Sequence, residues 1–434
     1  MNLPRLLLVN LALVLAVIVA ACGGTATAPT AAPKIDAKPT EPAKPAGAAS
    51  PASSPAAAAA SPASASASPA ASPGAAAAAS PAASPGASPA ASPGASPAAS
   101  PAASGAGATT AASSAAAPAM DPGPCVAANA TKARPSGKAR LVIGTGGTGG
   151  VFFPYGGGLA RIVTAKMPNA EMTAEVTGGS VDNMKLINSG EADVGMTTVD
   201  SAYDAFNGTD VYKDTGKIPA CAIAVLYQSY IHIVALADSN ITTVADMKGK
   251  RISVGSAGSS TEGAADRILD VNGVDPRRDI TRDNLSVAES VAAMKDRKID
   301  AFFWIGGLPT AAVTDLMATP NLRVNFIPGD TSIQPLRAKY GPLYTPFALP
   351  RAVYSGLPGD VPGIGIGNIL FVNADMDQGL VGELLKTVFD NLEEVRQIHP
   401  EARGLSLEGA AVQTSIPFHP GAIKYFQEKG VWKQ

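Results

Sequence analysis

The chain has 434 residues, a formal net charge of −2 and 5% aromatic residues. This near-neutral balance argues against nucleic-acid binding, which usually needs a basic patch with stacking rings. Three cysteines (Cys22, Cys125 and Cys221) and three histidines are thin material for a metal site or a thiol enzyme. We therefore expect no nucleic acid, metal or cofactor, and the length allows roughly two to four domains.

The N-terminal segment has the pattern of an export signal. Arg5 precedes an apolar run at 6–20, which is too short for a secure membrane span and typical of a signal peptide. Small residues then precede Cys22, as in the bacterial lipobox, where the cysteine is acylated and the chain is cut just before it. The alternative is an ordinary cleavage site beside a chance cysteine. We expect a lipoprotein signal peptide at 1–21 and a lipid anchor at Cys22 that holds the protein on the outer face of the cytoplasmic membrane.

A long segment of low complexity follows the signal. It consists mainly of Ala, Ser, Pro and Gly, and no charged residue occurs between Lys44 and Asp121. Recurrent proline opposes regular helix, and large apolar side chains that could form a core are lacking. We expect residues 22–138 to be a disordered, partly polyproline-II tether. Its serines leave O-glycosylation open.

The folded part is expected to begin at residue 139. Short apolar runs with strand character alternate there with segments whose apolar residues recur at helical spacing. The strand-like runs are 141–143, 172–176 and 192–196. This alternation predicts a parallel sheet under helices.

Loops of small residues follow these strands. The first, 144–150, satisfies G-x-G-x-x-G, and Glu175 stands where a ribose-binding acid would, so a dinucleotide enzyme is one interpretation. The design recurs at 177–180 and 255–262, which predicts several helix N-termini facing one cleft. A helix cap explains any single loop, whereas the set favours anion binding. We expect a protein that is not an enzyme, because an exported chain has no supply of NAD and no acid–base pair accompanies the first loop.

The motifs taken in order resemble the TAXI family, the solute receptors of one class of TRAP transporters. The resemblance covers about residues 139–430. The matching motifs are 144–150, 177–183, 190–195, 244–250, 255–262, 298–304 with 306–309, and 418–425. It implies an α/β, two-lobed periplasmic-binding-protein fold, type II-like, with parallel sheets in each lobe.

The resemblance also implies how the domain at 139–434 divides. Lobe one is expected at 139–235 and 346–434, and lobe two at 236–345. Apolar runs at 230–236 and 367–372 are expected to cross between the lobes as a hinge. Tyr227 and Tyr230 lie near this hinge, where core packing is the simpler interpretation.

The implied function is that of an extracytoplasmic receptor. It would capture a small carboxylate such as glutamate or 2-oxoglutarate and pass it, as a monomer, to TRAP-type permease subunits. The alternative is the substrate-binding lipoprotein of an ABC importer, because the two share a fold. The expected ligand-binding residues offer hydroxyls, an amide, backbone N–H groups or an aromatic wall: Thr148, Gly149, Tyr155, Thr177, Gly179, Ser180, Asn183, Ser256, Ser259, Ser260, Thr261, Trp304 and Gly306.

Two cysteines remain after lipidation. Cys125 lies just before the folded domain, and Cys221 just before the apolar run 222–226. An exported protein meets an oxidising compartment, where such a pair can bridge. The distance between the two Cα atoms cannot be read from the sequence, so the sequence does not decide whether these cysteines form a disulfide.

Overall fold

The computed structural model describes residues 121–433, so the predicted signal peptide and lipidated Cys22 lie outside the described residues. Its strands form one sheet in the order β2-β1-β3-β10-β4-β7-β5-β6, while β8 pairs with β4 and β9 with β10. The strands are β1 Ala139–Gly144, β2 Ala170–Glu175, β3 Val194–Thr198, β4 Ala220–Leu236, β5 Arg251–Ser253, β6 Thr281–Asp283, β7 Ala301–Gly306, β8 Val324–Phe326, β9 Tyr344–Leu349 and β10 Val361–Asn373.

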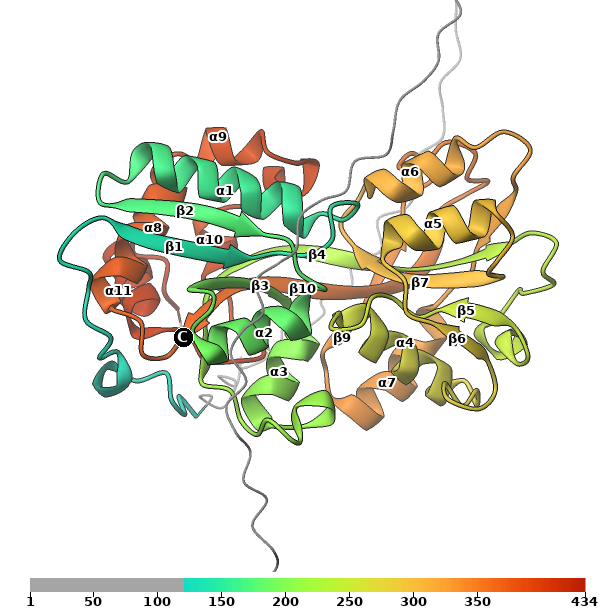
Figure 1. Ribbon diagram of the computed structural model, residues 1–434, viewed down its shortest axis with the longest axis horizontal. Helices are drawn as coiled ribbons and strands as arrows, with labels where there is room; N and C mark the ends of the chain where they lie inside the picture. The colour runs from blue at the N-terminus through green and yellow to red at the C-terminus, as the bar shows by residue number, and fades with distance from the viewer. Residues whose placement is uncertain (1–120, 434) are drawn as a thin grey trace, which may run out of the picture. The chain divides into compact units, whose positions relative to one another are not determined.

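Helices cover both faces of this sheet (Figure 1). Within the described residues, no helix is long and apolar enough to cross a membrane. The α-helices are α1 Phe152–Lys166, α2 Ser180–Ser189, α3 Val199–Asn207, α4 Ser260–Val271, α5 Val287–Lys295, α6 Ala311–Met317, α7 Ile333–Tyr340, α8 Gln378–Asp390, α9 Leu392–Arg396, α10 Leu407–Ala410 and α11 Pro420–Glu428, and the 3₁₀ turns are η1 Ala127–Asn129, η2 Asp210–Tyr212, η3 Val244–Met247, η4 Asp330–Ser332 and η5 Pro400–Gly404.

The sheet contains two parallel groups of strands. In one, β1 pairs with β2 and β3, and in the other, β5 pairs with β6 and β7. Helices separate the strands of each group along the chain, as parallel pairing requires. The predicted parallel arrangement is confirmed, but β10 runs antiparallel to β3 and β4, and β4 antiparallel to β7. The sheet as a whole is therefore mixed.

Strands β4 and β10 are long because each belongs to both lobes (Figure 1). The first half of β4 and the last residues of β10 pack in the core of lobe one, around β1–β3, while their other halves pack in the cores of lobe two, around β5–β9. Two lobes joined by two crossing strands form the periplasmic-binding-protein fold that the sequence predicts.

The second lobe reaches further along the chain than the boundary at 345 drawn from the sequence. Tyr354 and Val361 are buried in its core, as is Ile364. On β4, Ile231 already packs there. The reason is that β9 pairs with the first half of β10. This pairing places residues 346–366 in lobe two, and the chain returns to lobe one only in the second half of β10.

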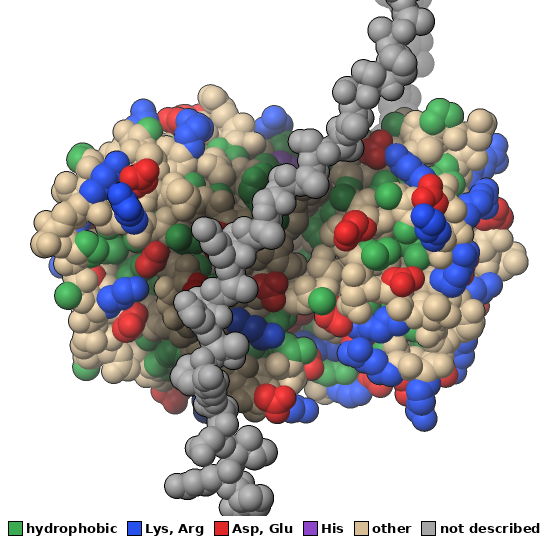
Figure 2. All heavy atoms as spheres, viewed as in Figure 1, with side chains coloured by type: hydrophobic (Ala, Val, Ile, Leu, Met, Phe, Trp, Pro, Cys, Tyr) green, Lys and Arg blue, Asp and Glu red, His purple; other side chains and the backbone are tan. Residues whose placement is uncertain are grey.

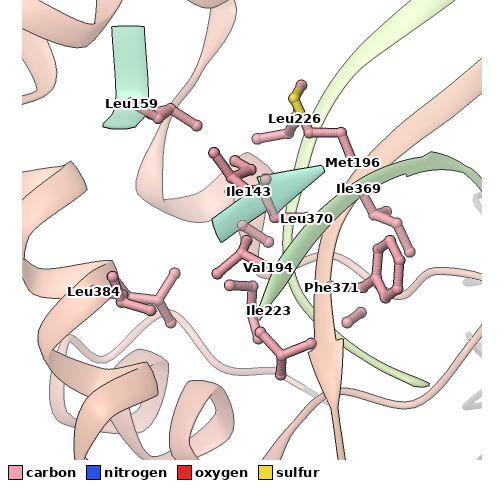
Figure 3. Packing of buried hydrophobic residues seen from close by; sticks show 14 of the residues in the cluster. Ile143, Leu159, Val194, Met196, Ile223, Leu226, Ile369, Leu370, Phe371 and Leu384 are labelled. Carbon is pink, nitrogen blue, oxygen red and sulfur yellow. The ribbon is translucent and has the colours of Figure 1, made fainter. Parts of the chain in front are cut away.

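The core of lobe one lies between the sheet and its covering helices. Figure 3 shows Ile143, Val194 and Leu370 from the strands in one space with Leu159 and Leu384 from the helices. Each of these side chains is at most 4% exposed. Burying an aliphatic side chain of this kind stabilises the fold by about 1.5–3 kcal/mol. This packing holds the strand ends that carry the loops of the cleft.

Residues 121–138, which the sequence assigns to the tether, pack on lobe one. A disulfide joins Cys125 to Cys221, which answers the question that the sequence leaves open. The backbone N–H of Lys132 donates to the carbonyl of Asp375 at 2.7 Å, and the guanidinium of Arg134 pairs with both carboxylate oxygens of Glu383. Composition hides this attachment, because it depends on one covalent bond and a few polar contacts instead of on apolar side chains.

Candidate functional site

A cavity of about 340 Å³ lies where the two lobes meet. This volume is at the small end of the range of ligand pockets, which suits a small solute. Within residues 121–433, no Lys or Arg lines the cavity, and Glu289 is the one charged side chain among the lining residues. The polar groups that face it are chiefly serine and threonine hydroxyls and the backbone of glycine-rich loops.

Five helices begin at the wall of this cavity. Their first residues or their N-caps belong to its lining, namely Phe152 of α1, Ser180 of α2, Thr198 before α3, Ser260 of α4 and Val287 of α5. Each helix follows a strand of a parallel group, so the helices start at the carboxyl ends of these strands, where ligands of α/β proteins bind. Such N-termini present N–H donors and a partial positive charge.

Not every N-terminus is free to take a ligand. The N–H groups of Val181 and Asp182 in α2 both donate to the carbonyl of Gly258 in lobe two, each at 3.1 Å. The N–H groups of Glu262 in α4 and Glu289 in α5 are capped by the Ser259 and Ser286 hydroxyls. Within residues 121–433, the N–H groups of the first two residues of α4, of α5 and of α1 have no acceptor. The donors that are free to face the cavity therefore come from α4 and α5 of lobe two and from α1 of lobe one, beside the loop of residues 146–150.

Glycine is required at two points of the lobe-one wall. Gly179, just before α2, has φ +126, a backbone conformation that other residues rarely adopt. At Gly150, an added Cβ would lie 2.8 Å from Cη2 of Trp304 in lobe two. The absence of a side chain at Gly150 thus allows the loop of one lobe to approach the aromatic wall of the other.

The lobes contact each other beside the cavity. The Ser180 hydroxyl accepts a hydrogen bond from the N–H of Thr198 at 3.2 Å and donates to the Ser260 hydroxyl at 3.2 Å. At the edge of the cleft, the N–H of Leu308 donates to the Glu401 carboxylate. The Ser180–Ser260 and Leu308–Glu401 bonds join elements of different lobes, so the structure shows the lobes closed on the cavity.

A buried ion-pair cluster forms a second contact between the lobes. Arg267 of α4 pairs with Asp204 of α3 and with Asp210 at 2.7 Å. Its guanidinium also donates to the Tyr344 hydroxyl at 3.2 Å, which donates to the Asp200 carboxylate at 3.0 Å. Burial raises the pKa of the Asp204 carboxyl above its usual value, and the charge of Arg267 opposes part of this rise. The cluster holds α3 of lobe one against α4 of lobe two.

All but two of the predicted ligand-binding residues line the cavity, and they come from both lobes. They are Thr148, Gly149, Thr177, Gly179, Ser180, Ser256, Ser259, Ser260, Thr261, Trp304 and Gly306. Trp304 forms part of the wall, and its indole N–H donates to the Thr310 hydroxyl at 3.0 Å. The Ser259 hydroxyl caps α4 by accepting from the N–H of Glu262 at 3.3 Å. The sequence thus predicts the loops that surround the cavity, and their contact with a ligand stays a prediction.

Asn183 and Tyr155 do not line the cavity. The Asn183 amide donates to the carbonyls of Thr145 and Met196, both at 2.7 Å, and therefore holds β1 and β3 together. Tyr155 is fully buried in α1, with its ring 5.8 Å from that of Tyr227. Both residues support the wall from behind. Sequence spacing does not show whether a side chain on the first turn of a helix points toward the cleft or away from it.

The floor of the cavity comes from the crossing strands, which the predicted set misses. Tyr227 and Ser229 of β4 and Asn368 of β10 belong to it. Burial raises the pKa of Tyr227 well above its usual range, so its hydroxyl stays protonated. A signal was present for Asn368, because an amide inside an otherwise apolar strand needs a polar partner. Ser286 and Glu289 also line the cavity, and their S-x-x-E spacing is that of a capping box.

Charged side chains do not gather in one patch on the face of the protein that Figure 2 shows. Figure 2 shows acidic and basic side chains interspersed over the part of this face that is not drawn in grey. Within residues 121–433, no group of three or more His, Cys, Asp or Glu side chains could hold a metal ion. His232 is fully buried and bonded to the Trp304 carbonyl at 3.2 Å and the Tyr354 hydroxyl at 3.0 Å.

The chain is similar to several solved structures, each at low sequence identity. The alkanesulfonate-binding protein SsuA from Xanthomonas axonopodis pv. citri, bound to MOPS, is 18% identical, with 69% of this chain and 96% of that chain covered and a TM-score of 0.38. A ligand-binding component of an ABC-type import system from Staphylococcus aureus, with zinc bound, is 13% identical, with 68% and 84% covered and a TM-score of 0.37. An ancestral arginine-binding protein bound to arginine is 14% identical, with 62% and 99% covered and a TM-score of 0.38.

The comparison with family models is decisive for membership. The model of the NMT1-like family matches residues 143–430, which begin within β1 and run past the end of α11. The match therefore includes both lobes, both crossing strands and every loop that lines the cavity. The chain belongs to the NMT1-like family.

Proposed function

We propose that the chain is the extracytoplasmic solute receptor of a TRAP-type secondary transporter, and that it captures a small carboxylate between its lobes. The observation that carries the proposal is the interlobe cavity, with helix N-termini and hydroxyls on its walls and no Lys or Arg among its lining residues. A carboxylate bound there is held by N–H donors, hydroxyls and helix dipoles. The motif resemblance to the TAXI family supports the choice of transporter class.

The starts of α4 and α5 supply the donors of lobe two for a bound carboxylate. Ser260 and Thr261 at the start of α4, with Val287 and Ala288 at the start of α5, line the cavity. Hydrogen bonds to a charged group contribute about 1.5–3 kcal/mol each, so the loss of one should weaken binding about ten- to a hundredfold, the more so because closure excludes water. The glycine loop of lobe one then covers the solute from the other side.

The disulfide supports the proposed location. Structural disulfides persist in oxidising compartments outside the cytoplasm, and Cys125–Cys221 is a buried bridge of this kind. We propose that lipid at Cys22 holds the protein on the outer face of the cytoplasmic membrane. Cys22→Ser should release the protein from the membrane fraction, whereas unchanged retention would refute the anchor.

A thermal-shift screen of the full-length protein tests solute capture. Glutamate, glutamine, 2-oxoglutarate, succinate and fumarate are compared with uncharged amides of matched size. We expect at least one carboxylate to raise the melting temperature and the amides to have no effect. If none of the carboxylates shifts it at millimolar concentration, the proposal is wrong.

The partner needs its own experiment, because the fold is shared by receptors of both transporter types. The protein is reconstituted with the TRAP-type permease subunits or with the ATP-driven importer of its organism, and solute uptake into vesicles is measured. We expect uptake that depends on an ion gradient and not on ATP. Uptake that requires ATP would assign the chain to an ABC importer instead.

A further inference from the structure

The floor of the cavity contains a buried amide whose oxygen is unused. Asn368 of β10 is 0% exposed, and it lines the cavity together with Tyr227 and Ser229 of β4. Its Oδ1 has no hydrogen-bond partner within residues 121–433. A buried acceptor without a partner costs about 1–3 kcal/mol, so native proteins retain few of them.

The orientation of this amide is fixed by its other end. The Asn368 Nδ2 donates to the backbone carbonyl of Tyr227 at 3.1 Å and to the Ser229 hydroxyl at 2.9 Å. A carbonyl oxygen can only accept, so exchanging Oδ1 and Nδ2 would place two acceptors against each other. Oδ1 is therefore the amide atom that is left without a partner. The hydroxyl of Tyr227 on the same floor also has no partner within residues 121–433, so the floor offers an unpaired acceptor and an unpaired hydroxyl.

The floor of the cavity is electrically neutral. In the part of the chain that the structure describes, no Lys or Arg lines the cavity. Its one carboxylate there, that of Glu289, accepts from the backbone N–H of Ser286, the N-cap of α5, at 2.9 Å. An ammonium group bound at Asn368 would bring a charge and three N–H donors to a place with no carboxylate of its own, and the desolvation would be costly. A hydroxyl brings no charge, one donor for the Asn368 Oδ1 and an acceptor for the Tyr227 hydroxyl, so it matches both unpaired groups of the floor.

We propose that Asn368 is a specificity-determining residue whose Oδ1 accepts a hydrogen bond from a hydroxyl of the solute, so that the preferred solute is a hydroxycarboxylate. This inference rests on the proposed function. The carboxylate faces the helix N-termini, and the hydroxyl faces the crossing strands. A keto oxygen at the same carbon can accept from the Tyr227 hydroxyl, but it cannot donate, so it leaves the Asn368 Oδ1 unpaired. A site built to bond a hydroxyl discriminates strongly against analogues that lack it.

The test uses solutes that differ at a single carbon. The full-length protein is titrated by calorimetry with 2-hydroxyglutarate, glutamate, 2-oxoglutarate and glutarate, and with the matched sets built on malate and on lactate. In the carbon skeleton that binds, we expect the hydroxy acid to bind at least tenfold more tightly than the oxo, amino and unsubstituted acids.

Each other outcome overturns the inference. Equal affinity for the oxo acid would show that water satisfies Oδ1, and preference for the amino acid would show that the floor accepts an ammonium. Either result leaves a carboxylate receptor standing and removes only the hydroxyl preference. If no carboxylate in any set binds, the proposed function fails together with this inference.

A variant changes the charge of the acceptor while nearly keeping its shape. Asn368→Asp places a carboxylate at the floor, so we expect the hydroxy acid to lose at least tenfold in affinity and the amino acid to become the best ligand of its set. Asn373→Asp is the matched control on the same strand, because its amide donates to the carbonyl of Ile187 away from the cavity. An unchanged order of affinities in folded Asn368→Asp would contradict the assignment, and if that variant does not fold, the wild-type ratios decide.

Discussion

The hydroxyl oxygens of Ser180 and Ser260 lie 3.2 Å apart and join the two lobes at the wall of the cavity. Ser180 starts α2 in lobe one, and Ser260 starts α4 in lobe two. Both side chains are buried, at 1% and 8% exposure, so opening of the cleft must break this bond. The pair therefore links closure to binding.

Removing this bond should weaken the closed form and with it the binding of solute. We expect Ser180→Ala and Ser260→Ala each to lower solute affinity about three- to tenfold, and the double variant to lose less than the product of the two, because they share one bond. Calorimetry on the four proteins gives the coupling energy. Ser189→Ala, at the exposed far end of α2, is the control and should bind normally. Strictly multiplicative losses would show that the two hydroxyls act independently.

Reduction of the disulfide should affect stability without affecting binding. Cys125–Cys221 closes a loop across 96 residues, and both cysteines pack within lobe one with Ala374. We expect the double variant Cys125→Ala/Cys221→Ala to lose about 2–4 kcal/mol in the free energy of unfolding. Urea denaturation measures this loss, and solute affinity should remain within about twofold of wild type. A large loss of affinity would mean that the N-terminal arm reaches the cleft.

The buried ion pairs of Arg267 should matter much more than exposed ones. Its side chain is 7% exposed and that of Asp204 13%, so Arg267→Met leaves a buried carboxylate without its partner. We expect a loss of about 3–5 kcal/mol in the free energy of unfolding. Arg277→Met removes an ion pair whose arginine is 64% exposed and should cost less than about 1 kcal/mol. Equal effects of the two changes would contradict the role of the cluster.

Stability should fall with acid in the range where buried histidines resist protonation. Burial lowers the pKa of His232 to about 4 and that of His419 to about 4. Both pKa values lie below the value of about 6.5 in the unfolded chain, so between these limits the unfolded state binds more protons. The free energy of unfolding should therefore decrease as pH falls from about 6.5 towards 4, by up to about 1.4 kcal/mol per pH unit for each histidine.

A variant separates one histidine from the other titrating groups. His419 caps α11 by accepting from the N–H of Gly421 at 3.1 Å, and His419→Asn keeps an acceptor at this position. Urea midpoints measured between about pH 7 and pH 5 should show a shallower decline in this variant than in wild type. The same slope in both proteins would show that His419 is protonated in the folded state.

Much of the cleft could be predicted because its walls repeat one local design. A strand, a loop of small residues and a helix recur, so Ser180, Ser259 and Thr261 could be placed at helix starts from spacing alone. The direction of a side chain within a first turn is not encoded that way. Spacing therefore predicts Asn183 as a ligand residue, whereas its amide donates to the backbone carbonyls of Thr145, next to β1, and of Met196 in β3.

The floor and the lobe boundary depend on strand pairing over long distances. Asn368 meets Tyr227 and Ser229 only because β10 returns antiparallel to β4 after more than a hundred residues. The pairing of β9 with β10 likewise assigns 346–366 to lobe two. The spacing of residues in the sequence does not show which residues of two distant strands pair. For the same reason, the sequence does not decide whether the disulfide forms, since the two cysteines are 96 residues apart in the chain.

The most direct test of the central claim compares solute binding in the full-length wild-type protein and in Gly150→Ala. The added methyl group would lie 2.8 Å from the Trp304 ring, so the loop of lobe one can no longer close on the wall of lobe two. Gly157→Ala, where an added Cβ meets no atom within 4 Å, is the control. The account predicts that a small carboxylate binds the wild type and the control with one-to-one stoichiometry, and that Gly150→Ala loses at least tenfold in affinity while remaining folded. Binding of equal strength in all three proteins would contradict capture of the solute in this cavity.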